Sequence, residues 1–187
     1  MNLPFWLRSL IPLRWQRTNR NEPISIVMLL REPHFFQANE LRNAAERAWH
    51  TSFSHEERES RHTVVQKGAV TLVKAGPHLL NLFFCASPYS EDPKSNTGWL
   101  PKASQREAWA QHAAYCAVDF MNDGASVQLG YCVLSQLVSE MLDGNCAGVY
   151  VPRERSLIPN DQSLYLTLHR FASACDSVVT SSDVSAR

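Results

Sequence analysis

Residues 24–30 read ISIVMLL, and this run decides the fold class. Every side chain in it except Ser25 is apolar, and Pro33 closes the segment shortly afterwards. A continuous apolar run of this length, rich in β-branched residues, is typical of a strand that is buried on both faces. We therefore predict that residues 24–30 form a central strand of a sheet.

Three long helices are predicted to cover this sheet. The first spans residues 37–50, where apolar side chains recur at helical spacing while the charged ones point away. The second runs from Val127 to Leu142 and is expected to stop at Gly144, because glycine readily adopts the left-handed conformation found at helix ends. The third is capped by Asn160 or Asp161 and continues to about Ala174.

Further strands are predicted where short apolar runs lie between turn residues. They are 64–65 and 70–74 on either side of Gly68, 79–86 after Gly76-Pro77, 115–120, and a last strand over 147–151. The predicted fold class is α+β, a two-layer sandwich. Its mixed, mostly antiparallel sheet has about five strands and carries three to four helices. Residues 23–175 are expected to form this single domain, with a basic, aromatic extension over 1–22 and a disordered tail over 176–187.

The charge balance argues against nucleic acid as a partner, because Lys plus Arg and Asp plus Glu both number 18. The first 20 residues nevertheless contain four arginines and no acidic residue. Over residues 3–15, large apolar side chains that include Phe5, Trp6 and Trp15 are interleaved with two of these arginines, Arg8 and Arg14. Such a segment is suited to peripheral membrane contact or to an apolar groove on a partner, and a loosely packed extension is the alternative.

The five cysteines form no C-x-x-C pair and mostly lie inside apolar runs. This pattern predicts free, buried thiols and a reducing compartment, and hence a cytoplasmic protein. No apolar stretch approaches the roughly 18 residues that a membrane-spanning helix needs.

No nucleotide, zinc-protease, hydrolase or calcium motif occurs, and the seven histidines lack metal-type spacing, so neither a metal nor another cofactor is expected. The most suggestive catalytic candidates are His112, Asp119 and Glu107. A helix followed by a strand would bring these two carboxylates and the imidazole to one edge, where they suit general acid-base chemistry. The structural alternative is that Glu107 completes a capping box with Ser104 at the start of a short helix, and that Asp119 fixes a turn.

A second candidate site is the proline-bounded loop over residues 152–159, which follows a buried strand. Arg153 and Arg155 within it are suited to a carboxylate or phosphate ligand, and His78 belongs to a similar turn over residues 74–78. The alternative for both segments is an ordinary solvated loop or turn.

Three segments resemble an uncharacterised bacterial family, domain of unknown function 4261. They are ISIVMLLREP at 24–33, AWAQHAAYCAVD at 108–119, and the late strand over 148–152. The resemblance extends over roughly residues 24–170 and does not include the arginine-rich extension. It implies a bacterial origin and supplies no activity and no catalytic residue.

The first functional hypothesis is a non-enzymatic interaction or regulatory module with a protein partner. Its contacts would be large aromatic residues outside the predicted core, since such residues dominate interface energetics: Phe5, Trp6, Trp15, Tyr89 and Trp99. Tyr89 and Trp99 lie in the long connection over 87–103. The second hypothesis is a small-molecule-binding protein or hydrolase-like enzyme with a site near His112, Asp119 and Arg153.

Overall fold

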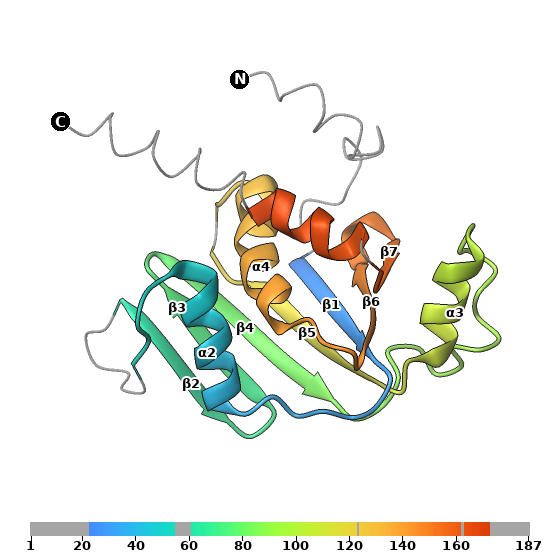
Figure 1. Ribbon diagram of the computed structural model, residues 1–187, viewed down its shortest axis with the longest axis horizontal. Helices are drawn as coiled ribbons and strands as arrows, with labels where there is room; N and C mark the ends of the chain where they lie inside the picture. The colour runs from blue at the N-terminus through green and yellow to red at the C-terminus, as the bar shows by residue number, and fades with distance from the viewer. Residues whose placement is uncertain (1–22, 55–60, 123, 162, 173–187) are drawn as a thin grey trace, which may run out of the picture.

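The stretch ISIVMLL forms strand β1 (Ile24–Leu30) in the interior of a seven-stranded sheet. The structure, a computed structural model, describes residues 23–54, 61–122, 124–161 and 163–172. β1 pairs with β5 (Ala114–Phe120) along one edge and with β6 (Cys146–Val151) along the other. The prediction of a central strand is therefore confirmed (Figure 1).

The other strands extend the sheet outward from this centre. They are β2 (His62–Lys67), β3 (Val70–Ala75), β4 (His78–Cys85) and β7 (Ser156–Pro159), and the full order is β2-β3-β4-β5-β1-β6-β7. All six pairings between these strands are antiparallel. The predicted α+β sandwich with a mostly antiparallel sheet is confirmed, but the expectation of about five strands is wrong.

The missed strand is β7. Residues 152–159 were predicted to be a loop, whereas they form a short 3-10 helix (Pro152–Glu154), a turn at Arg155, and β7. β7 pairs closely with β6 at Gly148, where an added Cβ would lie only 2.8 Å from the Ile158 carbonyl oxygen. The absence of a side chain at position 148 permits this approach.

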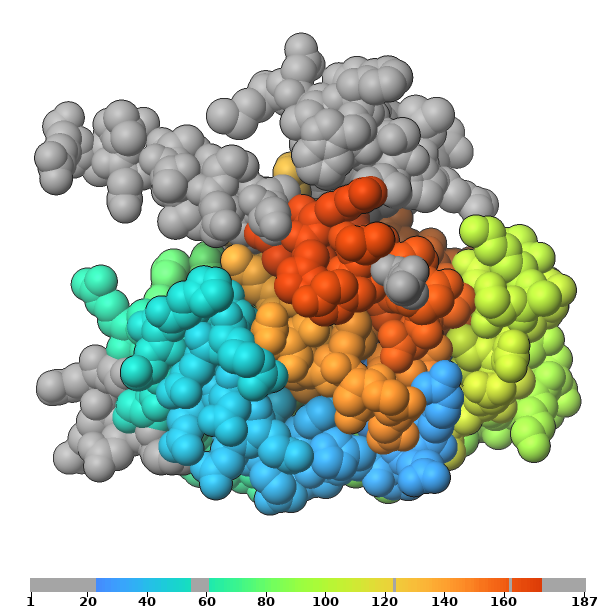
Figure 2. Space-filling model, in the orientation of Figure 1, coloured from blue at the N-terminus to red at the C-terminus, as the bar shows by residue number. Residues whose placement is uncertain are grey.

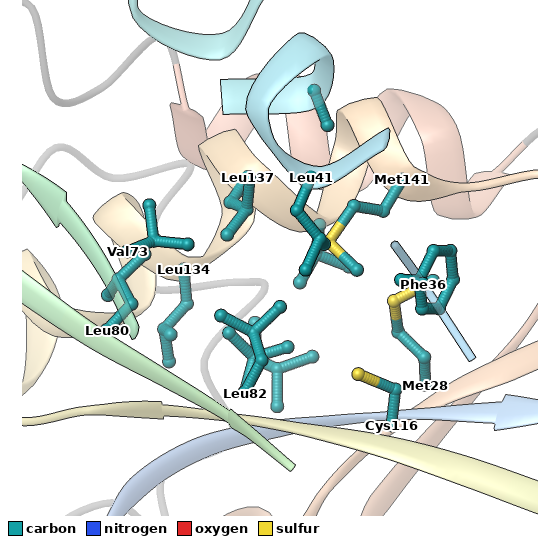
Figure 3. Packing of buried hydrophobic residues seen from close by; sticks show 14 of the residues in the cluster. Met28, Phe36, Leu41, Val73, Leu80, Leu82, Cys116, Leu134, Leu137 and Met141 are labelled. Atoms are coloured by element: carbon teal, nitrogen blue, oxygen red, sulfur yellow. The ribbon is translucent and has the colours of Figure 1, made fainter. Parts of the chain in front are cut away.

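Helices α2 (Ala38–Trp49), α4 (Val127–Met141) and the helix over residues 163–172 cover one face of the sheet (Figures 1 and 2). The main core lies between them. Met28, Leu80, Leu82 and Cys116 project from the strands toward Leu41 of α2 and toward a group from α4: Leu134, Leu137 and Met141 (Figure 3). The apolar residues whose spacing predicted these helices form the face that each helix buries.

Helix α3 (Ala103–Gln111) lies apart from the other helices, at one end of the sheet (Figure 1). It packs against the opposite face, where Val27 and Leu29 of β1 form a second, smaller core with Trp109 of α3 and Leu157 of β7. β1 is thus buried on both faces, as predicted, and the arrangement departs from a strict two-layer sandwich.

Two helix ends differ from the predictions. The first turn of α3 is not capped by Ser104 and Glu107; instead, the Gln105 side-chain oxygen accepts from the Lys102 backbone N–H at 3.1 Å. Gly144 does not have a positive φ, and α4 ends at Met141, ahead of a turn in which the Asp143 carboxylate accepts from the Asn145 N–H at 2.9 Å. The turn after α4 is therefore built on an aspartate.

The cysteines follow the prediction at three positions. Cys116 and Cys146 are buried free thiols, and Cys85 is a half-buried one. Cys132 on α4 is disulfide-bonded. The expectation of free thiols is therefore wrong at Cys132, which weakens the compositional argument for a reducing compartment.

None of the described helices combines the length and the hydropathy needed to cross a bilayer. The predicted extension over 1–22 and the predicted tail over 176–187 lie outside the described residues.

Candidate functional site

The face of the sheet opposite α2 and α4 is uncovered at β3 and β4, and large apolar side chains are exposed there. On β3, Thr71, Val73 and Ala75 are buried against the helices, while the alternate residues face outward. Val70 and Leu72 are 40% and 39% exposed, and Phe83, which is paired with Val70, is 39% exposed. We call the surface formed by Val70, Leu72 and Phe83 the open face. A solvated antiparallel sheet normally carries polar residues on its outer face, so this surface has the character of a contact site.

An aromatic cluster adjoins the open face and joins the 87–102 segment to the sheet. Tyr89 contacts Tyr115 edge-on at a centroid distance of 5.1 Å, and Tyr115 is 6.4 Å from Phe83. Trp99 contacts Trp109 and Tyr150 at 5.1 and 5.7 Å. Tyr89 and Trp99, predicted as interaction residues, therefore belong to one cluster and remain partly exposed at its surface.

His112 holds this cluster in place. Its Nε2 accepts a hydrogen bond from the Tyr89 backbone N–H at 3.0 Å, so its Nδ1 carries the proton and donates to the Trp109 carbonyl oxygen at 2.5 Å. The ring is 2% exposed, and burial lowers the pKa of His112 although the Trp109 hydrogen bond opposes this shift. Both nitrogens of a neutral imidazole are thus engaged in fixing the 87–102 segment to the end of α3.

Asp119 lies at the boundary between the aromatic cluster and the open face. Its Oδ1 accepts a hydrogen bond from the Ser25 hydroxyl at 2.5 Å, and its pairing partner on β4 is Asn81, which in turn pairs with Leu72. Burial raises the pKa of Tyr89, and the negative charge of Asp119 raises it further. The open face therefore has a carboxylate beside its apolar residues.

The three catalytic candidates do not meet. His112 precedes the first residue of β5 and Asp119 is near its last, so the strand separates them by roughly 20 Å. Glu107 is exposed on α3 and accepts a hydrogen bond from Gln111 Nε2 at 3.0 Å. The predicted grouping of these side chains at one edge is absent.

The predicted ligand residues are also apart. Arg153 lies in the 3-10 helix after β6 and Arg155 in the left-handed turn after it, whereas His78 begins β4. β1 and β5 lie between β6 and β4, a distance of about 14 Å at the usual strand spacing. Residues 74–78 include the Gly76 turn of the β3–β4 hairpin, as the alternative interpretation predicted.

A small cavity lies on the other side of the sheet, between the strands and the segment before α2. Its volume is about 10 Å³, room for a single water molecule, and its lining includes Phe35, Phe36 and Leu82. None of the candidate catalytic or ligand residues lines it. Within the described ranges no three His, Cys, Asp or Glu side chains are grouped as metal ligands.

Sequence reasoning missed Leu72, Phe83, Trp109 and Tyr150. The first two carried a usable signal, since β3 and β4 have apolar residues in both alternating registers, Leu72 beside Val73 and Phe83 beside Leu82, and so predict apolar side chains on both faces. Trp109 and Tyr150 come together only through the packing of α3 on β6. Phe5, Trp6 and Trp15 lie outside the described residues. No family model, curated protein or solved structure matches the chain.

Proposed function

We propose that this chain is a non-enzymatic interaction or regulatory module that binds a protein partner on the open face. The observation that carries the proposal is the exposure of Val70, Leu72 and Phe83 side by side on a sheet whose other face is fully used for the core. Large apolar side chains gathered on an outer face lose their contact with water when a partner covers them.

The partner's surface should be apolar with a basic side chain. Tyr89 and Trp99 extend the apolar area at its edge and supply the aromatic side chains that dominate binding energies. Asp119, already hydrogen-bonded by Ser25, retains lone pairs for an arginine or lysine of the partner. This combination of charge and apolar area favours a basic, apolar protein segment over nucleic acid.

Three further expectations belong to this proposal. The resemblance to domain of unknown function 4261 implies a bacterial protein, and the apolar, arginine-containing residues 3–15 remain candidates for peripheral membrane contact. A cytoplasmic location fits the buried free thiols Cys116 and Cys146. The alternative of a small-molecule or hydrolase-like site near His112, Asp119 and Arg153 is not proposed, because the length of β5 separates His112 from Asp119.

The test removes apolar side chains from the open face and replaces them with residues that also favour strands. Leu72→Thr combined with Phe83→Thr removes two large side chains from the open face, and threonine is well tolerated in strands. The matched control is Tyr165→Gln with Leu166→Gln, which alters two side chains that are each 54% exposed on the helix over 163–172. Both variants should unfold at temperatures near that of the wild type.

Each tagged protein is expressed in its native cells, cross-linked, and its bound proteins are quantified by mass spectrometry. We expect at least one protein that the wild type and the control recover equally and that the Leu72→Thr/Phe83→Thr variant recovers more than about tenfold less, the effect of losing contact hot spots. Equal recovery by all three proteins would refute the proposal.

A further inference from the structure

We propose that residues 3–15 of this chain are the resting occupant of the open face, with one of their arginines at Asp119, so that a partner must displace them. The inference rests on the proposed function, because it takes the open face as a docking surface. It adds an intramolecular competitor and therefore a means of regulation.

The chemistry of the two surfaces matches. Residues 3–15 read LPFWLRSLIPLRW, with Arg8 and Arg14 set among leucine, isoleucine and aromatic side chains. The open face offers apolar area at Leu72 and Phe83 with the Asp119 carboxylate beside it. Apolar side chains lose contact with water on docking, and an arginine gains a carboxylate partner.

The chain also connects the two surfaces at the right place. Ile24, the first residue of β1, pairs with Phe120, and the next row across the sheet contains Ser25, Asp119, Asn81 and Leu72 in that order. The chain that follows residues 3–15 therefore enters the sheet beside the row that holds the Asp119 carboxylate. β3 is three strand spacings from β1, about 14 Å, and residues 16–22 can span up to about 23 Å when extended.

Tethering favours this occupant over a second copy of the chain. A segment joined through a short linker has an effective concentration of about millimolar at its site, far above a second copy at micromolar concentration. Lys74 lies on the same face, one strand beyond β4. Its charge directs the arginines of the segment toward Asp119.

The test is photo-cross-linking of the purified full-length chain. The photoreactive amino acid p-benzoylphenylalanine replaces Phe83 in one protein and Tyr165, as a control on the opposite side of the sheet, in another. We expect cross-linked peptides that join position 83 to residues 3–15, and none that join position 165 to them. Irradiating a mixture of ¹⁵N-labelled and unlabelled chains separates cross-links within one chain from those between two. Thermal unfolding verifies that both proteins are folded.

Two variants test the chemistry of the contact. Trp6→Ala with Trp15→Ala should abolish most of the cross-linking at position 83, and Asp119→Asn should reduce it by up to about fivefold, the effect of losing one exposed ion pair. Cross-links at position 83 that join two chains would assign the face to a second copy and overturn the proposal. Equal yields at positions 83 and 165 would also overturn it.

This experiment contains no partner, so it is independent of the recovery experiment on the open face. One combined outcome is that intramolecular cross-links form while the recovery experiment finds no partner that depends on Leu72 and Phe83. This pair of results would mean that the segment covers the open face permanently. A partner lost with those residues but no intramolecular cross-link would leave the proposed function in place and remove the competitor.

Discussion

His112 links its ionisation to the stability of the fold. Burial lowers its pKa from the ordinary value of 6.5, because a charged imidazole between Tyr89 and Trp109 would lose its water shell. Below pH 6.5 the unfolded chain therefore binds a proton that the folded chain resists, and the unfolding free energy falls as the pH falls. At higher pH both states are neutral at this residue, and its contribution is fully present.

We expect His112→Gln to flatten this pH dependence while lowering stability at neutral pH. The measurement is urea unfolding of both proteins from about pH 7.5 down to about pH 5. Burial also lowers the pKa of His78, so part of the slope should remain and should disappear on adding His78→Gln. Parallel curves for the wild type and His112→Gln would contradict the assignment.

The described free cysteines should differ sharply in reactivity. Burial raises the pKa of Cys116 and of Cys146 to about 12, so neither is a thiolate near neutral pH. The Ser87 hydroxyl, 3.0 Å from the Cys85 sulfur, lowers the pKa of Cys85 instead.

We predict that iodoacetamide modifies Cys85 first in the native protein and reaches Cys116 and Cys146 only on unfolding. Peptide mass spectrometry over a time course gives the rates. Ser87→Ala should slow the reaction at Cys85, since it removes the hydrogen bond that favours the thiolate. Modification of Cys116 as fast as Cys85 would show that the core is open.

At the scale of elements, β7 depends on Gly148. A Cβ at this position would lie 2.8 Å from the Ile158 carbonyl oxygen and 3.2 Å from the Pro159 Cα, and backbone atoms cannot move aside as a side-chain end can. We expect Gly148→Ala to destabilise the protein by about 1–3 kcal/mol, the usual cost of overpacking.

The matched control is Gly98→Ala, where an added Cβ meets nothing within 4 Å. Its midpoint in urea should equal that of the wild type or exceed it slightly. If the two substitutions shift the midpoint equally, the close approach of β6 and β7 is not what position 148 provides.

A comparison of β7 with β1 and α4 shows which elements could be predicted from the sequence. β1 and α4 were predictable because both sequences are long. β1 is a continuous apolar run, and the apolar residues of α4 recur at helical spacing. β7 is only four residues long and ends in proline, so its pattern matches that of a loop. The grouping of Tyr89, Trp99 and Tyr150 was also beyond prediction, since it depends on which face of the sheet α3 covers.

At the scale of the whole molecule, the two cores should differ in stability. The main core draws on α2, α4, the helix over 163–172 and six strands, whereas the second consists of a few residues around Trp109, Leu100 and Leu157. Local opening is cheapest where few apolar side chains are buried. The segment from 87 to 111 should therefore open while the rest of the sheet stays closed.

We predict that Trp109→Ala abolishes hydrogen-exchange protection in α3 and leaves α4 and β1 protected. Removing a buried tryptophan costs about 3–5 kcal/mol, which exceeds what a small core supplies. Hydrogen exchange read by mass spectrometry distinguishes the regions, and Trp99→Ala, at an exposed ring of the same cluster, is the milder comparison. Uniform loss of protection throughout the chain would show that the two cores unfold together.

The position of β1 also has a consequence for synthesis on the ribosome. Ser25 of β1 bonds to Asp119, 94 residues later, and Arg31, just past its end, bonds to Gly144, 113 residues later. The most apolar strand is thus translated well before either neighbour exists, and both of its edges wait unpaired in the nascent chain. Such a segment is a natural target for a ribosome-associated chaperone, and the yield of native protein should fall when translation pauses between β1 and β6.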